Sequence, residues 1–242
     1  MPFREVKKGE KPKIVDKSKP STHDLEPPTK QGLQLSSPAI LSLGFLALIV
    51  MGTVLLSLPI ATIQPISLLA AAFTATSAVT VTGLNVVDTA NYTTFGQLVI
   101  AALIQFGGLG FMTFAILVLT SLQGKMGLSG SITAQEALGT HSNQIGSTAK
   151  AVIKIAFITE SLGFLGLTLL LAPLKGLKDA MYEAFFLCIS AFNNAGFALN
   201  GNNMTAYVHQ PMISFIISLL IITGGIGFLV ILDIIKHKRW QK

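Results

Sequence analysis

Two short stretches of the sequence could bind a cation through their main chain. The first consists of Val79, Thr80, Val81, Thr82 and Gly83, and the second of Phe192, Asn193, Asn194, Ala195 and Gly196. Each stretch ends in a glycine, which accepts backbone dihedral angles that other residues resist. This freedom lets successive carbonyl oxygens point the same way, and a ring of such oxygens can replace the water shell of a potassium ion. The sequence therefore predicts cation coordination by backbone oxygens without a side-chain carboxylate.

The remaining reactive side chains do not form a recognisable site. The four histidines, His23, His141, His209 and His237, are scattered along the chain, and Cys188 is the only cysteine. This distribution excludes an intrachain disulfide and argues against a zinc or iron-sulfur site. The polar segments contain no nucleophile with a base and an orienting group, and no carboxylate pair. We expect no enzyme activity, no bound cofactor and no metal other than potassium at the two stretches.

The composition is typical of a membrane protein. Apolar residues make up 51% of the chain and charged residues only 12%, half the usual fraction in a soluble domain. Between Leu33 and Lys125, Asp88 is the only charged residue. A segment of this length with a single charge predicts several passages through the bilayer.

The net charge of +6 comes from basic residues in the N-terminal tail, the centre of the chain and the C-terminal end. No basic face with interleaved aromatic residues occurs, so nucleic acid is a poor candidate for a partner. Because these basic segments flank apolar ones, the positive-inside rule predicts that all three lie on the cytoplasmic side of the membrane.

The two glycine-ended stretches follow helices that are too short to cross a bilayer. Four apolar segments are long enough to cross, namely residues 38–59, 95–122, 150–172 and 211–235. Residues 66–78 and 177–191 are predicted to form short helices that enter the membrane and stop partway. Lipid cannot satisfy the free backbone groups that follow such a helix, so they must face protein or a water-filled path.

The predicted fold is an all-α polytopic membrane protein with two parallel repeats, each made of a helix, a re-entrant pore helix with its loop, and a second helix. The expected segments are a disordered basic cytoplasmic tail over residues 1–37, a first repeat over 38–122, a cytoplasmic linker over 123–150, a second repeat over 151–235 and a basic cytoplasmic end over 236–242. Each repeat crosses the bilayer twice, so both run in the same direction.

The repeats also match residue by residue. Ser77 and Ala78 correspond to Ser190 and Ala191, and a Gly-Gly-x-Gly-Phe motif recurs in the last helix of each repeat. The glycines of this motif are Gly107, Gly108 and Gly110 in the first repeat and Gly224, Gly225 and Gly227 in the second. They could serve close helix packing, because small residues are common at helix interfaces in membranes, or they could mark a bend or gate.

These motifs resemble a known family. The sequences over residues 76–84 and 190–197, together with the Gly-Gly-x-Gly-Phe motifs, are similar to those of the Trk, Ktr and HKT potassium transporters, and most of all to the bacterial Ktr membrane subunit. The resemblance covers most of residues 36–242. It implies a pore of four such units around one axis, with a filter centred on one glycine per unit. Gly83 and Gly196 would hold those positions here, and glycine at 83 favours potassium.

The resemblance further implies potassium uptake across the bacterial plasma membrane, with or without sodium coupling. It implies a homodimer of the full-length subunit and a cytoplasmic regulatory ring that binds the nucleotide and gates the pore. This sequence contains only two of the four units. Either it is the first half of a longer protein, or two copies supply the four units.

Two other functions stay open at this stage. The chain could be a nonconducting scaffold or half-subunit that needs a second half or a partner chain. It could also be an ion-coupled carrier with inverted repeats, in which case the two halves would face opposite ways.

Glu160 lies inside a predicted span, where an isolated charge is costly and often functional. Its carboxylate could be an internally hydrogen-bonded structural group or part of an ion path.

Overall fold

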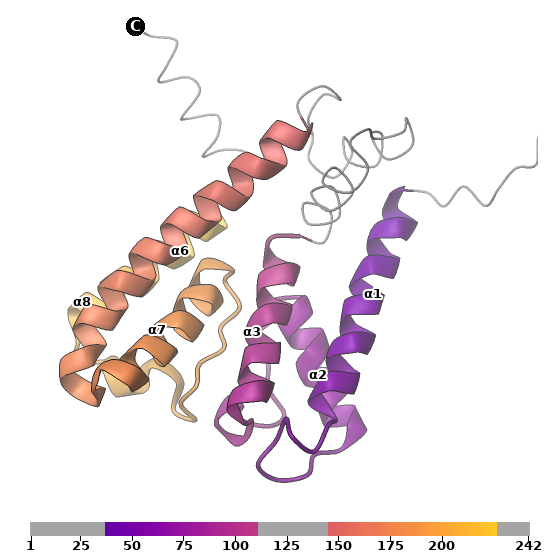
Figure 1. Cartoon of the computed structure of the whole chain (residues 1–242), viewed down its shortest axis with the longest axis horizontal. Coiled ribbons are helices and arrows are strands. Elements are labelled where there is room, and N and C mark those ends of the chain that lie inside the picture. The colour runs from indigo at the N-terminus through magenta and orange to yellow at the C-terminus, as the bar shows by residue number, and fades with distance from the viewer. Residues whose placement is uncertain (1–36, 111–144, 227–242) are drawn as a thin grey trace, which may run out of the picture. The chain divides into compact units, whose positions relative to one another are not determined.

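The computed structural model describes residues 37–110 and 145–226, and every regular element within these ranges is a helix (Figure 1). The prediction of an all-helical chain is confirmed for the described residues. Several predictions concern residues outside them: most of the tail and of the linker, the later parts of two expected spans, the basic C-terminal end, and Gly227.

The first group of helices is built around a short helix. It consists of α1 (Ser37–Leu56), α2 (Leu68–Val79), the 3-10 helix η2 (Thr89–Asn91) and α3 (Thr94–Gly108). α2 begins after Ser67, whose side chain accepts a hydrogen bond from the Ala70 amide. Thr93 caps α3 in the same way by accepting from the Gly96 amide. Such caps satisfy backbone donors that have no partner within the helix, and so fix where each helix starts.

Small side chains bring these three helices together. Ala71 and Ala75 of α2 are fully buried. A Cβ atom at Gly52 of α1 would lie 2.6 Å from a methyl carbon of Leu103 in α3 and 3.2 Å from the Cβ of Ala75. The absence of a side chain at Gly52 therefore lets all three helices approach one another closely.

The loops on either side of α2 are joined to each other. Thr62 and Tyr92 form an isolated antiparallel bridge, and the Ile63 amide donates to the Asn91 carbonyl oxygen at 2.9 Å. The buried hydroxyl of Tyr92 donates to Thr74 Oγ1 at 3.0 Å. These bonds hold the start of α3 against α2.

The second group follows the same order. It consists of α6 (Ile145–Lys175), α7 (Leu177–Phe192), the 3-10 helix η4 (Asn203–Tyr207) and α8 (Pro211–Gly225). Gly176, with φ of 81°, reverses the chain between α6 and α7 in a conformation that glycine adopts without steric cost. Gly163 and Gly166 of α6 lie against Leu220 and Ile216 of α8, which brings these two long helices close.

A buried carboxylate joins the elements of the second group. Glu183 of α7 is 5% exposed and pairs with the Lys175 Nζ at 2.6 Å. Asn200 Nδ2 donates to the same carboxylate at 2.8 Å, and the Tyr207 hydroxyl also donates to it. Burial and the hydrogen bond to Glu183 raise the pKa of Tyr207, so its hydroxyl stays a donor. Glu183 is thus stabilised in the way that a buried charge requires.

Two of the helices lie where the sequence predicts short helices. α2 and α7 coincide within two residues with the two short helices that the sequence predicts, and each lies beside two other helices of its group (Figure 1). α6 begins at Ile145, within the predicted linker.

Many large apolar side chains lie on the outside of the helices. Phe157 and Leu169 of α6 are 71% and 73% exposed, and Leu46 and Val54 of α1 are more than half exposed. Within the described residues, the segment Lys150–Lys175 is long and apolar enough to cross a membrane, and the described apolar parts of α1, α3 and α8 are shorter. Soluble proteins rarely expose so many apolar side chains, so this surface suits contact with lipid.

Candidate functional site

The two glycine-ended stretches have the same backbone conformation. We call residues 79–83, after α2, the first loop, and residues 192–196, after α7, the second loop. Val81 and Asn194 have φ of 50° and 58°, and Gly83 and Gly196 have φ of 76° and 74°. Positive φ is rare outside glycine and is costly for a β-branched residue such as Val81. Positive φ therefore recurs at equivalent residues, and the backbone of the two loops turns in the same way.

Backbone hydrogen bonds repeat in the same positions. The Thr82 amide donates to the Ser77 carbonyl oxygen at 3.0 Å, and the Ala195 amide donates to the Ser190 carbonyl oxygen at 2.7 Å. Each bond folds the loop back onto the last turn of its short helix. The C-terminal end of a helix carries a partial negative charge, so each loop lies where a cation is favoured.

The two loops touch at their glycines. A Cβ atom at Gly83 would overlap the carbonyl oxygen of Ala195, and one at Gly196 would lie 3.6 Å from the Cα of Gly83. Gly83 therefore has two reasons to be glycine, its positive φ and this approach of a backbone from the other group. The structure brings together the two stretches that the sequence singled out.

The last helix of each group lies against the end of the short helix through a glycine. A Cβ atom at Gly107 of α3 would overlap the Val79 carbonyl oxygen, and one at Gly224 of α8 would overlap the Phe192 carbonyl oxygen. At both positions the missing side chain allows this close approach. Gly110 has φ of 77°, and within the described ranges no atom beyond its chain neighbours lies within 4 Å of its Cβ position. That the helices bend at these motifs stays a prediction.

The first loop is held by hydroxyl groups of its threonines and of Ser77 in the last turn of α2. Ser77 Oγ accepts hydrogen bonds from the Leu84 amide at 2.9 Å and from Thr82 Oγ1 at 3.0 Å. Thr80 Oγ1 donates to the Thr76 carbonyl oxygen at 2.8 Å. All of these partners lie within seven residues along the chain.

The second loop is held by amide side chains that reach other helices. Asn193 Nδ2 donates to Gln105 Oε1 of α3 at 2.8 Å and to the Ile189 carbonyl oxygen at 2.9 Å. When the side-chain oxygen and nitrogen of Asn194 are assigned so that both find a partner, this side chain donates to the Ile221 carbonyl oxygen and accepts from the Gly225 amide of α8, at 3.2 Å each. The second loop therefore depends on both α3 and α8 for its side-chain contacts.

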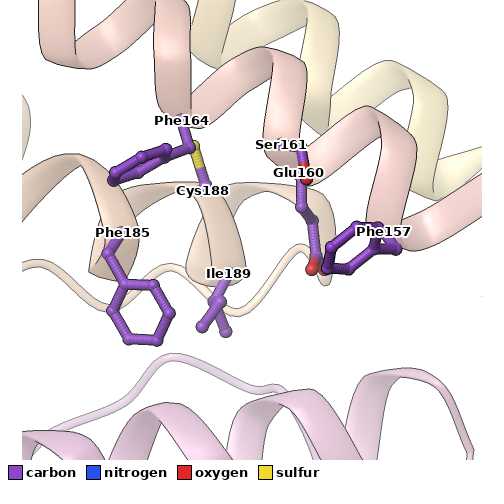
Figure 2. Close-up of a pocket in the computed structure, with 7 residues that line it drawn as sticks. All are labelled: Phe157, Glu160, Ser161, Phe164, Phe185, Cys188 and Ile189. Atoms are coloured by element: carbon purple, nitrogen blue, oxygen red, sulfur yellow. The ribbon is translucent and has the colours of Figure 1, made fainter.

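Glu160 extends this network to α6. Its two carboxylate oxygens accept hydrogen bonds from Gln105 Nε2 at 2.9 and 3.2 Å. Glu160 also borders an apolar cavity of about 200 Å³ between α6 and α7 (Figure 2). The side chains around the cavity are Phe157, Glu160, Ser161, Phe164, Phe185, Cys188 and Ile189. The carboxylate is thus internally hydrogen-bonded, which is the first of the two interpretations of Glu160. Its participation in an ion path stays a prediction.

Comparison with known proteins shows the family of this chain. The sequence profile of the family described as TrkH, cation transport protein, matches residues 31–241. The chain belongs to the TrkH family. Because this is a family of cation transporters, the TrkH-family chain is a membrane protein, as its composition predicts. The family is not one of enzymes.

Several curated relatives are similar over most of the chain. The Ktr system potassium uptake protein B of Bacillus subtilis (strain 168) is 45% identical over 212 residues, which cover 86% of this chain and 47% of that protein. The protein of the same name from Vibrio alginolyticus is 40% identical over 207 residues, with 85% and 45% covered. The potassium/sodium uptake protein NtpJ of Enterococcus hirae is 35% identical over 215 residues, with 86% and 47% covered. The TrkH-family chain spans about half the length of the curated relatives it matches. The resemblance to Trk and Ktr proteins is confirmed.

The sequence pattern located the two loops of the TrkH-family chain and singled out Glu160, but it did not indicate Gln105. Gln105 had a usable signal, since it is an isolated amide in an apolar segment two residues before a glycine motif. No pattern along the chain indicates that its partners are Glu160 and Asn193. Within the described ranges, no group of three or more His, Cys, Asp or Glu side chains is placed to hold a metal ion.

Proposed function

We propose that this chain forms two of the four units of a potassium-conducting pore, and that the backbone oxygens of the first and second loops coordinate the ion. The observation that carries the proposal is the matched backbone of the two loops and their contact at Gly83 and Gly196. The names of the relatives support potassium as the ion, because two of them are potassium uptake proteins and a third is a potassium/sodium uptake protein.

The chemistry follows from the backbone. A dehydrated potassium ion needs several oxygen ligands at once, and carbonyl oxygens on neighbouring strands of chain can supply them. The negative ends of α2 and α7 add a modest attraction for a cation. Gly83 and Gly196 would permit the required backbone dihedral angles. Because the ligands are then neutral carbonyl oxygens and not a carboxylate, the ion is released readily enough to pass.

The assembly is part of the proposal. Four units are needed to surround an ion, and they come either from a longer chain or from two copies of this one. We propose a homodimer of the full-length subunit in the bacterial plasma membrane, controlled by a cytoplasmic ring that binds the regulatory nucleotide. Both termini and the segment between the two groups would face the cytoplasm. Potassium flux measured with and without sodium tests whether uptake requires sodium.

The test is to place a carboxylate at each loop glycine of the complete native protein. We expect Gly83→Asp and Gly196→Asp to abolish potassium uptake in cells that lack their own uptake systems, while membrane insertion is kept. Gly176→Asp is the matched control, because Gly176 also has positive φ but lies in open space away from the loops. It should retain uptake. Normal uptake by both loop variants would overturn the proposal.

A nonconducting scaffold that assembles with a second chain is the second candidate. Purified native protein in lipid vesicles distinguishes the two. A pore carries potassium down an imposed gradient, whereas a scaffold leaves the vesicles sealed unless a second chain is added.

A further inference from the structure

A chain of three polar side chains runs from α6 to the second loop. Glu160 of α6 accepts from Gln105 Nε2 of α3 at 2.9 Å, and Gln105 Oε1 accepts from Asn193 Nδ2 at 2.8 Å. The three residues come from three different elements, and Gln105 and Glu160 are 55 residues apart in the sequence. Each bond has the length of a normal hydrogen bond, so the three side chains are connected without a gap.

We propose that Glu160 is a positioning residue for the second loop and acts through Gln105 and Asn193. This inference rests on the proposed function, because only an ion-binding loop needs its oxygens held at fixed positions. Glu160 does not touch the ion. It sets the orientation of the side chain that holds the loop.

The reason lies in what each group can donate. A carboxylate only accepts hydrogen bonds, whereas an amide has one accepting end and one donating end. Glu160 therefore requires Gln105 to turn its NH₂ group toward α6, which leaves the Gln105 oxygen facing Asn193. Asn193 must then donate with its own NH₂ group. Without the carboxylate, Gln105 could turn over and present its NH₂ group to that of Asn193, and the contact would be lost.

The surroundings of Glu160 strengthen this interpretation. Four of the seven residues around the cavity beside Glu160 are aromatic or aliphatic, Cys188 is a fifth of low polarity, and Ser161 carries the only hydroxyl among them (Figure 2). A carboxylate in such surroundings has a high cost unless it is hydrogen-bonded. Both of its oxygens accept from Gln105, so these hydrogen bonds to α3 offset part of this cost.

Asn193 passes this constraint to the backbone. It is the residue immediately after α7, and its Nδ2 also donates to the Ile189 carbonyl oxygen at 2.9 Å. Its side chain lies against Gly108, where any Cβ atom would overlap it. A rotation of the Asn193 side chain would therefore disturb both the end of α7 and the start of the loop.

An exchange of the two side chains tests the proposal in the complete native protein with its partner subunits. Gln105→Glu alone puts two carboxylates face to face and removes the donor to Glu160. In the double variant Glu160→Gln with Gln105→Glu, the amide introduced at position 160 donates to the carboxylate introduced at position 105, which still accepts from Asn193. The readout is the ratio of potassium to sodium flux in lipid vesicles, together with the thermal unfolding midpoint in detergent.

We expect Gln105→Glu to lower the flux ratio about tenfold, because repulsion from Glu160 moves the carboxylate at position 105 away from Asn193 and one hydrogen bond to a charged group is lost. The double variant removes this repulsion and should return the ratio to within about threefold of the wild type. Tyr182→Phe is the matched control. It deletes another bond between α7 and α3, from Tyr182 to Gln97 at 2.7 Å, which does not reach the loop. It should leave the flux ratio within about twofold of the wild type even if the unfolding midpoint falls.

The outcomes separate this inference from the proposed function. If the wild type selects potassium, an unchanged flux ratio in Gln105→Glu would overturn the positioning role alone. A double variant that does not recover the flux ratio would have the same consequence. If Gln105→Glu fails to fold, Asn193→Ala takes its place, and an unchanged ratio in that variant has the same consequence. A wild type that conducts no potassium would overturn the proposed function and this inference with it.

Discussion

The first and second loops share a backbone and differ in what holds it. Both have positive φ at two equivalent residues and fold back onto the last turn of a short helix. The first loop is held by hydroxyl groups of its own segment, chiefly Ser77. The second is held by Asn193 and Asn194, whose partners lie on α3 and α8.

The difference shows which property the two groups have in common. Side chains at equivalent positions differ, such as Val81 and Asn194, whereas the dihedral angles agree. A function that depends on the positions of backbone oxygens needs only the dihedral angles to agree. The first loop depends on local contacts, and the second depends on where α3, α6 and α8 lie.

The largest expected effect concerns the glycines at which the two groups are alike. Because a Cβ atom would overlap a backbone oxygen at both sites, we expect Gly107→Ala and Gly224→Ala each to lower the free energy of unfolding by about 3 kcal/mol. Gly225→Ala is the control, since its nearest neighbour is the Asn194 amide at 3.7 Å. Denaturant unfolding in detergent measures all three. Equal losses in Gly224→Ala and Gly225→Ala would contradict the account.

A smaller effect should distinguish the buried polar contacts of Glu183 in the second group from those of Tyr92 in the first. Glu183→Ala leaves Lys175 and Tyr207 without their partner, and we expect a loss of about 2 kcal/mol because Lys175 is partly exposed and keeps some water. In the first group, Tyr92→Phe removes only the bond to Thr74, and about 1 kcal/mol should be lost. Thermal unfolding compares them. A larger loss in Tyr92→Phe than in Glu183→Ala would show that the first group depends more heavily on these polar contacts.

Exchanging the residues of positive φ should have effects of unequal size. Asn194→Val puts a β-branched residue at positive φ and removes the contacts with α8, so we expect a loss of about 1.5 kcal/mol. Val81→Asn introduces a residue that tolerates this conformation, and the change should lie within about 0.5 kcal/mol of zero. Unfolding midpoints of the two variants test this. A larger loss in Val81→Asn would mean that packing of Val81 outweighs its backbone strain.

The smallest expected effect concerns the serines before the loops. Ser77→Ala removes the acceptor of two hydrogen bonds of the first loop, and about 1 kcal/mol of stability should be lost. For Ser190, no corresponding side-chain bond to its loop occurs in the described part of the chain, so Ser190→Ala should cost about 0.5 kcal/mol or less. The two unfolding curves are compared directly. Equal losses would argue against a local hold on the first loop alone.

Much of the fold could be predicted from local signals. The length of each apolar segment separates the short helices from the long ones, and the start of α2 is encoded by Ser67 and the alanine-rich sequence after it. The glycines at 83 and 196 pointed to unusual dihedral angles, because no other residue adopts them as easily. These signals act over a few residues and can be read along the chain.

The contacts between the two groups could not be predicted. Glu160, Gln105 and Asn193 meet because α3, α6 and α7 pack together, and that packing depends on side chains far apart in the sequence. The contact of Gly83 with Ala195 is of the same kind. The sequence supplied the residue types, and only the arrangement of the helices determines which of them are neighbours.

The most direct test is to locate the ion. Crystals of the complete native protein grown with rubidium or thallium in place of potassium would give anomalous scattering at any site of a potassium-like ion. We expect a peak next to the backbone oxygens of both loops, where Gly83 and Gly196 approach each other. A protein that transports these ions but shows its peak elsewhere, with none at the loops, would contradict it.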